Sequence, residues 1–343
     1  MAPADAIRTA RFFWIQTKIM DTYYLGFDIG GTNARCALIR NTEGQFKILA
    51  SQKHSIRGSQ TPRDVALVIR HVVSKLPQDF QINANELSGI GVAIAGQIAI
   101  DEHTILNAPN LNWHGVNFYD VIRESIADLA PDVRIRIAND LNAIAWGEYH
   151  FGAARTIPSL LAVYVGTGIG GGLILDGKLM LGADNVSGEI GHCKFPRYKD
   201  YPCGCGQSGC VEAFAGGKAI EYRILHDIQN GVISRQELGL SDDEHPTARC
   251  IERAWRNGLP YAKAFWEETA MAIGMLIANA IAVINPHGLL LGGGVLEGCP
   301  ELLSLVVGNI MDYAPRASTA NLQFIKPTLH DDAGTLGAAL LCL

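Results

Sequence analysis

The order of apolar and polar residues along the chain predicts the same supersecondary unit twice. Residues 23–39 form an apolar strand, a Gly-Gly-Thr turn and a second strand, and residues 160–175 repeat this order around another Gly- and Thr-containing turn. The repeats are 135 positions apart, counted from Gly31 to Gly166. Two copies of one hairpin predict a duplicated architecture in which each of two lobes presents one glycine-rich turn.

Helix and strand patterns alternate through the rest of the chain. Apolar residues at helical spacing predict a helix at 61–76. Further helices are predicted at about 218–229, 246–257 and 260–284, and a helix of small residues at 333–343. Buried strands are predicted at 86–96, 133–140 and 288–295. Strands that alternate with helices indicate an α/β fold whose sheets are covered on both faces.

Length and composition fit a globular protein of two lobes. A chain of 343 residues exceeds the size at which a single core stops growing. Hydrophobic residues make up 48% of the chain and charged residues 18%, as in an ordinary globular protein. The formal charge of −6 leaves no basic stripe that could bind the phosphate backbone of a nucleic acid, so we expect no nucleic-acid partner. The apolar run 271–284 is too short to span a membrane and stops at Asn285-Pro286, which predicts a buried helix.

The N-terminus and the scattered cysteines indicate a cytoplasmic protein. Residues 1–21 lack a sustained apolar core followed by a small-residue cleavage site, so we expect an N-terminal extension and no secretion signal. Five of the eight cysteines lie far apart, without the spacing of a disulfide framework. A reducing compartment fits this pattern.

The two glycine-rich turns are suited to hold phosphate. The first supplies Gly30, Gly31 and Thr32, whose backbone N–H groups can face an anion, and Asp28 before them is suited to hold Mg²⁺. Alone, this motif is explained equally well by a plain glycine hairpin. The second turn supplies Gly166, Thr167, Gly168, Gly170 and Gly171. Two matching turns favour a phosphate clamp, and neither has the pattern of a P-loop or of a dinucleotide-binding motif.

Two further motifs follow buried strands. At the end of the strand 133–140, Asp140 is suited to orient a hydroxyl group and accept its proton if the reaction transfers a phosphoryl group to that hydroxyl, with Asn139 as a partner for sugar hydroxyls. An Asx turn or a helix N-cap explains the same pair. The glycines Gly292 to Gly294 offer exposed backbone to an adenine ring, although close helix–strand packing explains them as well.

Carboxylates and an imidazole flank a cluster of cysteines. Glu189, His192 and Glu212 are suited to a polyhydroxy ligand, because each carboxylate can accept protons from two hydroxyl groups. Exposed surface glutamates are the simple alternative.

The cysteine cluster itself has metal-ligand spacing. The pattern H-x10-C-x-C-x4-C, made by His192, Cys203, Cys205 and Cys210, gives a closed tetrahedral shell for a structural Zn²⁺. A redox role is disfavoured, because C-x-C differs from the C-x-x-C motif of thioredoxins. Cys193 is a competing ligand by position, yet its adjacency to His192 makes joint coordination strained.

Together these motifs resemble the ROK group of bacterial sugar kinases and repressors, in the actin/hexokinase-like superfamily. The resemblance covers the chain from about Tyr23 onward and is most specific in GEIGH (188–192) and CGCGQSGCVE (203–212), combined with DIGGT (28–32) and GTGIGGG (166–172). It implies a two-lobed actin-like ATPase (ribonuclease H-like) fold with a duplicated core and a cleft between the lobes.

The resemblance also implies a role for each motif. Asp140 becomes the catalytic base, and the hairpins hold the phosphates of MgATP, with adenosine near Gly293 and Gly294. Asn33 replaces the lysine of the common GGTK pattern, so the phosphate-binding role of that lysine is in question here. The implied sugar contacts are Gly96, Asn110, Asn139, Asp140, Glu189, His192 and Glu212. His192 and the three cysteines become the zinc site, and His192 then binds both metal and sugar through its two ring nitrogens.

The function implied is an ATP-dependent transfer of the γ-phosphoryl group to the 6-hydroxyl group of glucose. An N-acetylglucosamine or N-acetylmannosamine 6-kinase is the close alternative, and a sugar-sensing regulator is disfavoured because only about 22 residues precede the first strand. The expected lobes are 22–138, joined by the helix 333–343, and 139–332, which holds the zinc-binding segment 187–217. A homodimer is the default for such enzymes.

Overall fold

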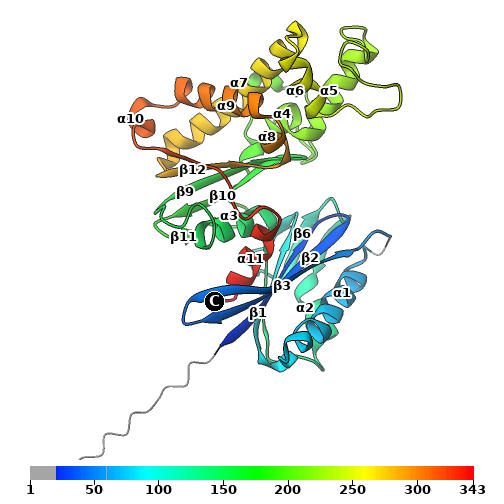
Figure 1. The fold of residues 1–343 in the computed structure, drawn as a ribbon, viewed down its shortest axis with the longest axis vertical. Coiled ribbons are helices and arrows are strands. Elements are labelled where there is room, and N and C mark those ends of the chain that lie inside the picture. The colour runs from blue at the N-terminus through cyan, green and yellow to red at the C-terminus, as the bar shows by residue number, and fades with distance from the viewer. Residues whose placement is uncertain (1–20, 59) are drawn as a thin grey trace, which may run out of the picture.

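A computed structural model describes residues 21–58 and 60–343, so the expected extension lies outside the described residues except for Asp21. The chain forms two lobes, each built on a five-stranded sheet (Figure 1). A small three-stranded sheet belongs to the first lobe. The predicted two-lobed α/β architecture is confirmed.

The two large sheets have the same strand order and the same strand directions. The first sheet runs β3-β2-β1-β4-β8, with β1 antiparallel to β2 and parallel to β4. The second runs β11-β10-β9-β12-β13, with β9 antiparallel to β10 and parallel to β12. The duplication predicted from two hairpins therefore extends to whole sheets. The strands are β1 (Thr22–Ile29), β2 (Asn33–Thr42), β3 (Gln45–Ser55), β4 (Leu87–Ile94), β8 (Arg134–Asn139), β9 (Leu160–Val165), β10 (Ile169–Leu175), β11 (Lys178–Leu179), β12 (Gly288–Gly292) and β13 (Gln323–Ile325).

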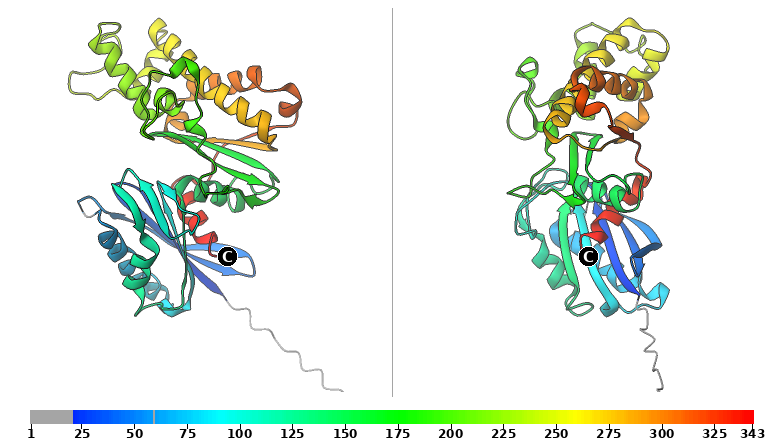
Figure 2. Two further views of the ribbon diagram at one scale, coloured as in Figure 1. Left: turned by 180° about the vertical axis from the view of Figure 1, so that it is seen from behind. Right: turned by 90° about the vertical axis from the view of Figure 1, so that its left-hand side faces the viewer.

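Two helices cover the outer face of the first sheet (Figure 2). Helix α1 (Pro62–Lys75) is capped by Thr61, whose side chain forms a capping box with that of Asp64. Its buried apolar stripe packs into the core of the first lobe together with α2 (Phe118–Ile126). The small sheet consists of β5 (Gln97–Ile98), β6 (Thr104–Ala108) and β7 (Trp113–Asn117).

Helices of the second lobe pack on the face of its sheet that points away from the first lobe (Figure 1). Among the described residues, α7 is the one helix long and apolar enough to cross a membrane, and 50% of that stretch is buried. Its side chains Trp266, Ile273 and Leu276 lie in the core, as expected for a buried helix. The helices here are α4 (Glu212–Ala215), α5 (Gly217–Gln229), α6 (Ala248–Arg256), α7 (Pro260–Ile284), α8 (Gly294–Gly298), α9 (Pro300–Tyr313) and α10 (Arg316–Thr319).

Helices α3 (Asp140–His150) and α11 (Ala333–Leu340) pack against each other between the two sheets (Figure 1). A Cβ atom at Gly337 of α11 would lie only 1.7 Å from the Ala143 carbonyl oxygen of α3, so glycine permits this approach. Helix α11 also lies on the inner face of the first sheet, where a Cβ at Gly91 would meet the Ala338 carbonyl oxygen at 1.8 Å. The predicted C-terminal helix thus packs on the first lobe.

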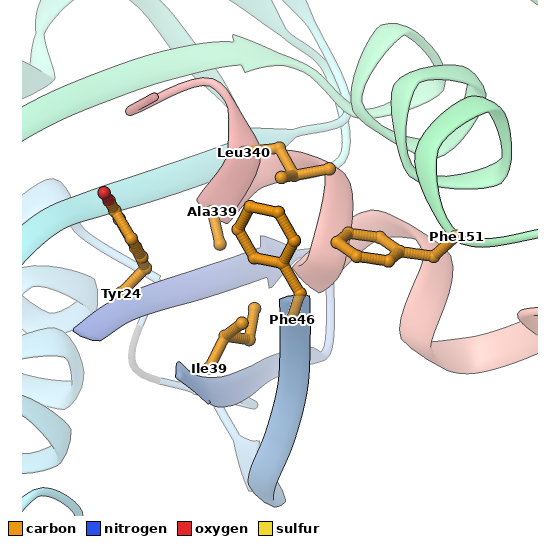
Figure 3. A pocket seen from close by; sticks show the side chains of 6 residues that line it. All are labelled: Tyr24, Ile39, Phe46, Phe151, Ala339 and Leu340. Carbon is orange, nitrogen blue, oxygen red and sulfur yellow. The ribbon is translucent and has the colours of Figure 1, made fainter. Parts of the chain in front are cut away.

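Aromatic side chains surround the end of α11. Figure 3 shows Phe46 of β3 and Phe151 after α3 beside Leu340, and the two rings meet edge to face at 5.2 Å. The apolar pocket that they line with Tyr24 and Ile39 lies away from the glycine-rich turns.

Several elements differ from the sequence prediction. The strand predicted at 288–295 ends at Gly292, because Gly293 takes a φ of +95° and α8 begins at Gly294. Helices α2 and α9 and strand β3 were not predicted. The short 3₁₀ helices are η1 (Gln78–Phe80), η2 (Ala84–Glu86), η3 (Ile190–His192), η4 (Pro196–Tyr198) and η5 (His330–Asp332).

Candidate active site

Asn139 ends β8 and caps α3, so it fixes the position of the next residue, Asp140. Its Oδ1 atom accepts hydrogen bonds from the backbone N–H groups of Leu141, at 2.9 Å, and Asn142, at 3.1 Å. Its Nδ2 atom donates to the carbonyl oxygen of Gly96 at 3.0 Å. The capping role considered from sequence is therefore real, and it places Asp140 at the edge of the sheet where α/β proteins bind ligands.

Asp140 remains partly accessible to solvent, as contact with a substrate requires. Burial, followed by the negative charge of Asp28 and a smaller contribution from Glu189, raises the pKa of Asp140 to about 7. Hydrogen bonding by the Leu141 N–H opposes this rise in part. Three carboxylates gathered at the junction of the lobes form an environment suited to a general base or a cation.

Asp28 lies at the end of β1, opposite Arg35 of β2. Burial raises the pKa of Asp28, and the Arg35 guanidinium opposes this effect. Arg35 also bonds to Asp331, at 2.6 Å, just before α11. A Cβ at Gly334 would lie 2.9 Å from the Asp28 carboxyl carbon, so the start of α11 closes over this side chain.

The first glycine-rich turn lies against a predicted sugar contact. The Gly30 N–H donates to the Asn33 carbonyl oxygen at 3.0 Å and closes the turn, and the Asn33 side chain bonds to the Thr32 hydroxyl at 2.9 Å. A Cβ at Gly31 would lie 2.9 Å from the carbonyl oxygen of Asn110. Asn110 is exposed, and Gly96 lies at the start of the hairpin that ends in the Asn110 loop.

The second turn is tied to the start of α5. The Gly166 N–H donates to the Gly168 carbonyl oxygen, and the Gly166 and Thr167 carbonyl oxygens accept bonds from the N–H groups of Gly217, at 2.9 Å, and Lys218, at 3.0 Å. A Cβ at Gly166 would contact nothing within 4 Å. The space beside Gly166 is therefore free, and Thr167 is exposed.

The remaining glycines of this motif pack against protein atoms. Gly170 and Gly171 lie inside β10 and are buried, and a Cβ on them would meet the Leu141 side chain at 2.5 Å and the Ala162 carbonyl oxygen at 2.4 Å. Close packing explains both residues, and their contact with phosphate stays a prediction. At Gly168 a Cβ would lie 2.2 Å from the Glu212 carboxylate.

A cavity of about 300 Å³ opens beside the second turn. It lies where α5, α6 and α8 meet, next to the predicted adenosine contact Gly294. A Cβ at Gly293 would meet the Val165 carbonyl oxygen at 2.5 Å, so Gly293 serves close packing of its turn on β9. The lining residues are Gly217, Glu221, Thr247, Ala248, Arg249, Gly294, Val295 and Cys299. Sequence reasoning missed Glu221, Thr247 and Arg249, because no local motif indicates which helices meet here.

The predicted metal ligands gather in one cluster. One ligand atom from each of His192, Cys203, Cys205 and Cys210 lies within 4.8 Å of all the others. The sulfur atoms of Cys205 and Cys210 lie 3.6 Å apart, close to the edge of about 3.8 Å that Zn–S bonds of about 2.3 Å give a tetrahedron. The residues therefore fit Zn²⁺.

The surroundings of the cluster agree with this ligand set. Lys194 donates to the Cys210 sulfur at 3.0 Å, which favours a thiolate. Cys193 is exposed and outside the cluster, so it does not compete as a ligand. All eight cysteines lie within the described residues, and none is in a disulfide.

Glu212 joins the metal cluster to the second turn. Its Oε1 atom lies 3.8 Å from the Cys203 sulfur, and its Oε2 atom accepts a hydrogen bond from the Ile169 N–H at 2.9 Å. On the other side, the Nε2 atom of His192 lies 3.5 Å from the Glu189 carboxylate. The structure thus brings the predicted sugar contacts Glu189, His192 and Glu212 around the cluster.

The comparisons with known proteins agree with one another. The ROK family model matches residues 24–343. A glucokinase of Halalkalibacterium halodurans is 29% identical over 94% of this chain and 95% of its own length. A ROK hexokinase from Thermus thermophilus superposes with a TM-score of 0.75 at 26% identity, over 94% of this chain and 97% of the other. A ROK glucokinase from Streptomyces griseus, solved in complex with glucose and AMPPNP, gives 0.71 at 27% identity, over 93% and 98% of the two chains.

Proposed function

Because this chain belongs to the ROK family, we propose that it is an ATP-dependent hexose kinase that transfers the γ-phosphoryl group of MgATP to the 6-hydroxyl group of glucose. The related glucokinases and the ROK hexokinase support the phosphotransferase activity. The choice of glucose is supported by the glucokinases among the relatives, and the roles of the individual site residues are argued from the geometry of this chain.

The observation that carries the proposal is the environment of Asp140. A general base works best when its pKa lies near the working pH, and the pKa of Asp140 is raised to about 7. Asp140 lies at the carboxyl end of β8, between residues of both lobes, and Asn139 and the α3 backbone hold it in place. In our proposal, Asp140 accepts the proton of the 6-hydroxyl group as that oxygen attacks the γ-phosphorus.

The two glycine-rich turns are the proposed ATP-phosphate contacts. The free space beside Gly166 and the exposure of Thr167 support this role. In our proposal Asp28 would hold Mg²⁺, which would offset negative charge between the phosphates and the carboxylates. The cavity beside Gly294 has the size and polar lining to take the nucleoside, with Glu221 and Arg249 as its charged groups.

The zinc site has a structural role in this proposal. Four protein ligands leave no position for a reacting water molecule, so His192 and the three cysteines would hold Zn²⁺ as a brace for the sugar-binding wall. Since Nδ1 of His192 faces the Cys203 sulfur at 3.6 Å, Nε2 is left to bond a sugar hydroxyl group.

A panel of sugars with ADP detection tests the proposed substrate. We expect turnover with glucose, and slower turnover with N-acetylglucosamine and N-acetylmannosamine, whose acetamido group needs extra space near C2. Turnover of an acetamido sugar with none of glucose would contradict the assignment of glucose but keep the kinase. No ADP formation with any hexose would contradict the kinase itself. We also propose that the protein is cytoplasmic and forms a homodimer, and light scattering of the purified protein would test the homodimer.

A further inference from the structure

One side chain joins the two lobes beside the proposed sugar site. Asn185, in the loop after β11 of the second lobe, donates a hydrogen bond from Nδ2 to the carbonyl oxygen of Ala99, in the turn after β5 of the first lobe, at 3.1 Å. The Asn185 side chain is buried, with 8% of the residue exposed. This bond connects segments that are 86 positions apart in the chain.

Asn185 is held by its own loop. It has a φ of +61°, in the left-handed region, where asparagine is tolerated better than most residues. The loop is closed by a bond from the Ser187 N–H to the Leu181 carbonyl oxygen at 3.0 Å. At its far end the Gly171 N–H of β10 donates to the Gly188 carbonyl oxygen at 3.0 Å, so the loop is fixed to the second sheet.

The turn that carries Ala99 is fixed as well. The Ala99 N–H donates to the Thr104 carbonyl oxygen at 2.8 Å, and the Asp101 carboxylate accepts bonds from the N–H groups of His103 and Thr104, both at 2.9 Å. Glu102 pairs with Arg136 of β8 at 2.7 Å. Because other bonds also hold both segments, the Asn185 bond connects two ordered parts of the molecule.

These two parts carry opposite halves of the proposed sugar site. Asn185 precedes Glu189 by four residues, and Ala99 follows Gly96 by three. We propose that Asn185 is a positioning residue that latches the Glu189 segment to the Gly96 hairpin and so preorganises the site for the hexose. This inference rests on the proposed function, and it assigns no contact between Asn185 and substrate.

Two variants remove the latch in different ways. Asn185→Gly keeps the left-handed backbone and deletes the donor. Asn185→Asp keeps the shape but places an acceptor against the Ala99 carbonyl oxygen. Asn285→Gly is the matched control, because Asn285 also has a positive φ, of 49°, yet is exposed at the end of α7. We expect the KM for hexose to rise about two- to tenfold in Asn185→Gly and about tenfold or more in Asn185→Asp, with the KM for MgATP unchanged.

Steady-state kinetics on the zinc-loaded full chain, with melting temperatures for each variant, decide the outcome. A selective rise in the hexose KM in both variants, absent from Asn285→Gly, supports the latch. A hexose KM within twofold of wild type in Asn185→Asp overturns it, and so does a parallel rise in both KM values, which indicates general damage. If the wild-type protein phosphorylates no hexose, the proposed function fails, and that result is distinct from failure of the latch.

Discussion

The Nδ1 atom of His192 lies 3.6 Å from the sulfur of Cys203, which turns the opposite ring nitrogen toward the Glu189 carboxylate. The imidazole of His192 thereby connects the cluster of proposed metal ligands to the proposed sugar site. Glu212 makes a second connection, from the Cys203 sulfur to the backbone of β10. In our proposal the cluster therefore shapes the sugar site through His192 and Glu212 and has a structural role.

Loss of zinc should lower both stability and sugar binding. We expect Cys205→Ser to release zinc, lower the melting temperature and reduce kcat/KM for hexose at least about tenfold, because His192 and Glu212 lose their support. Metal analysis, calorimetry and kinetics on the same preparation measure all three. The control is Cys193→Ser, which changes an exposed thiol outside the cluster and should retain the metal. A folded, fully active Cys205→Ser protein without zinc would refute the structural role.

The activity should depend on pH through Asp140. Because the pKa of Asp140 is raised to about 7, this carboxyl group is protonated at lower pH and cannot accept a proton. We expect kcat/KM for hexose to fall about tenfold per unit below pH 7. Asp28→Asn removes one of the charges that raise the pKa of Asp140, so the acid limb should move to lower pH. A profile that is flat from about pH 5.5 to 8 would exclude this assignment.

The second glycine-rich turn can be tested without disturbing the fold. A methyl group at Gly166 contacts no protein atom, so any effect of Gly166→Ala on kinetics arises from a ligand. Alanine keeps every backbone hydrogen-bonding group, so the added methyl group acts by obstructing the phosphate, and we expect the KM for MgATP to rise about tenfold, as for the loss of one or two hydrogen bonds. The control is Gly308→Ala in α9, where the added methyl group is equally free of contacts. Equal KM values for MgATP in Gly166→Ala and Gly308→Ala would show that this turn does not contact ATP.

A change in the cavity between α5 and α8 should affect the binding of nucleotide and leave the binding of hexose unchanged. Glu221→Gln removes the negative charge of its lining and weakens the carboxylate as an acceptor for ribose or base groups. We expect the KM for MgATP to rise about tenfold while the KM for hexose stays the same. A change in the hexose KM in place of the ATP KM would place the nucleotide elsewhere.

Local motifs were sufficient to predict the hairpins and the clustering of the proposed metal ligands. The Gly-Thr turns recur in sequence, and the four proposed ligands come from one short stretch of the chain, residues 192–210. The strand ends at Asn139 and Gly292 were predicted to within three residues. The same local reasoning assigned Gly170 and Gly171 to phosphate, although both pack inside β10.

What the sequence did not predict depends on contacts between distant segments. Glu221 and Arg249 share a cavity only because α5 and α6 pack side by side. The bond between Asn185 and Ala99 depends on how the two lobes face each other. Glu148 is another example: its buried carboxylate accepts bonds from the Thr328 and Leu329 N–H groups, both at 2.8 Å, and anchors the segment before α11. None of these pairs has a local sequence signal.

The most direct test of the central claim is Asp140→Asn, measured for turnover, hexose binding and melting temperature together. We expect turnover to fall at least about a hundredfold, because the general base is lost, while titration calorimetry still detects hexose. Burial raises the pKa of Asp140, so the ionised carboxylate destabilises the fold above pH 7, and the neutral amide should raise the melting temperature there. Turnover at the wild-type rate in a stable Asp140→Asn protein would contradict the account.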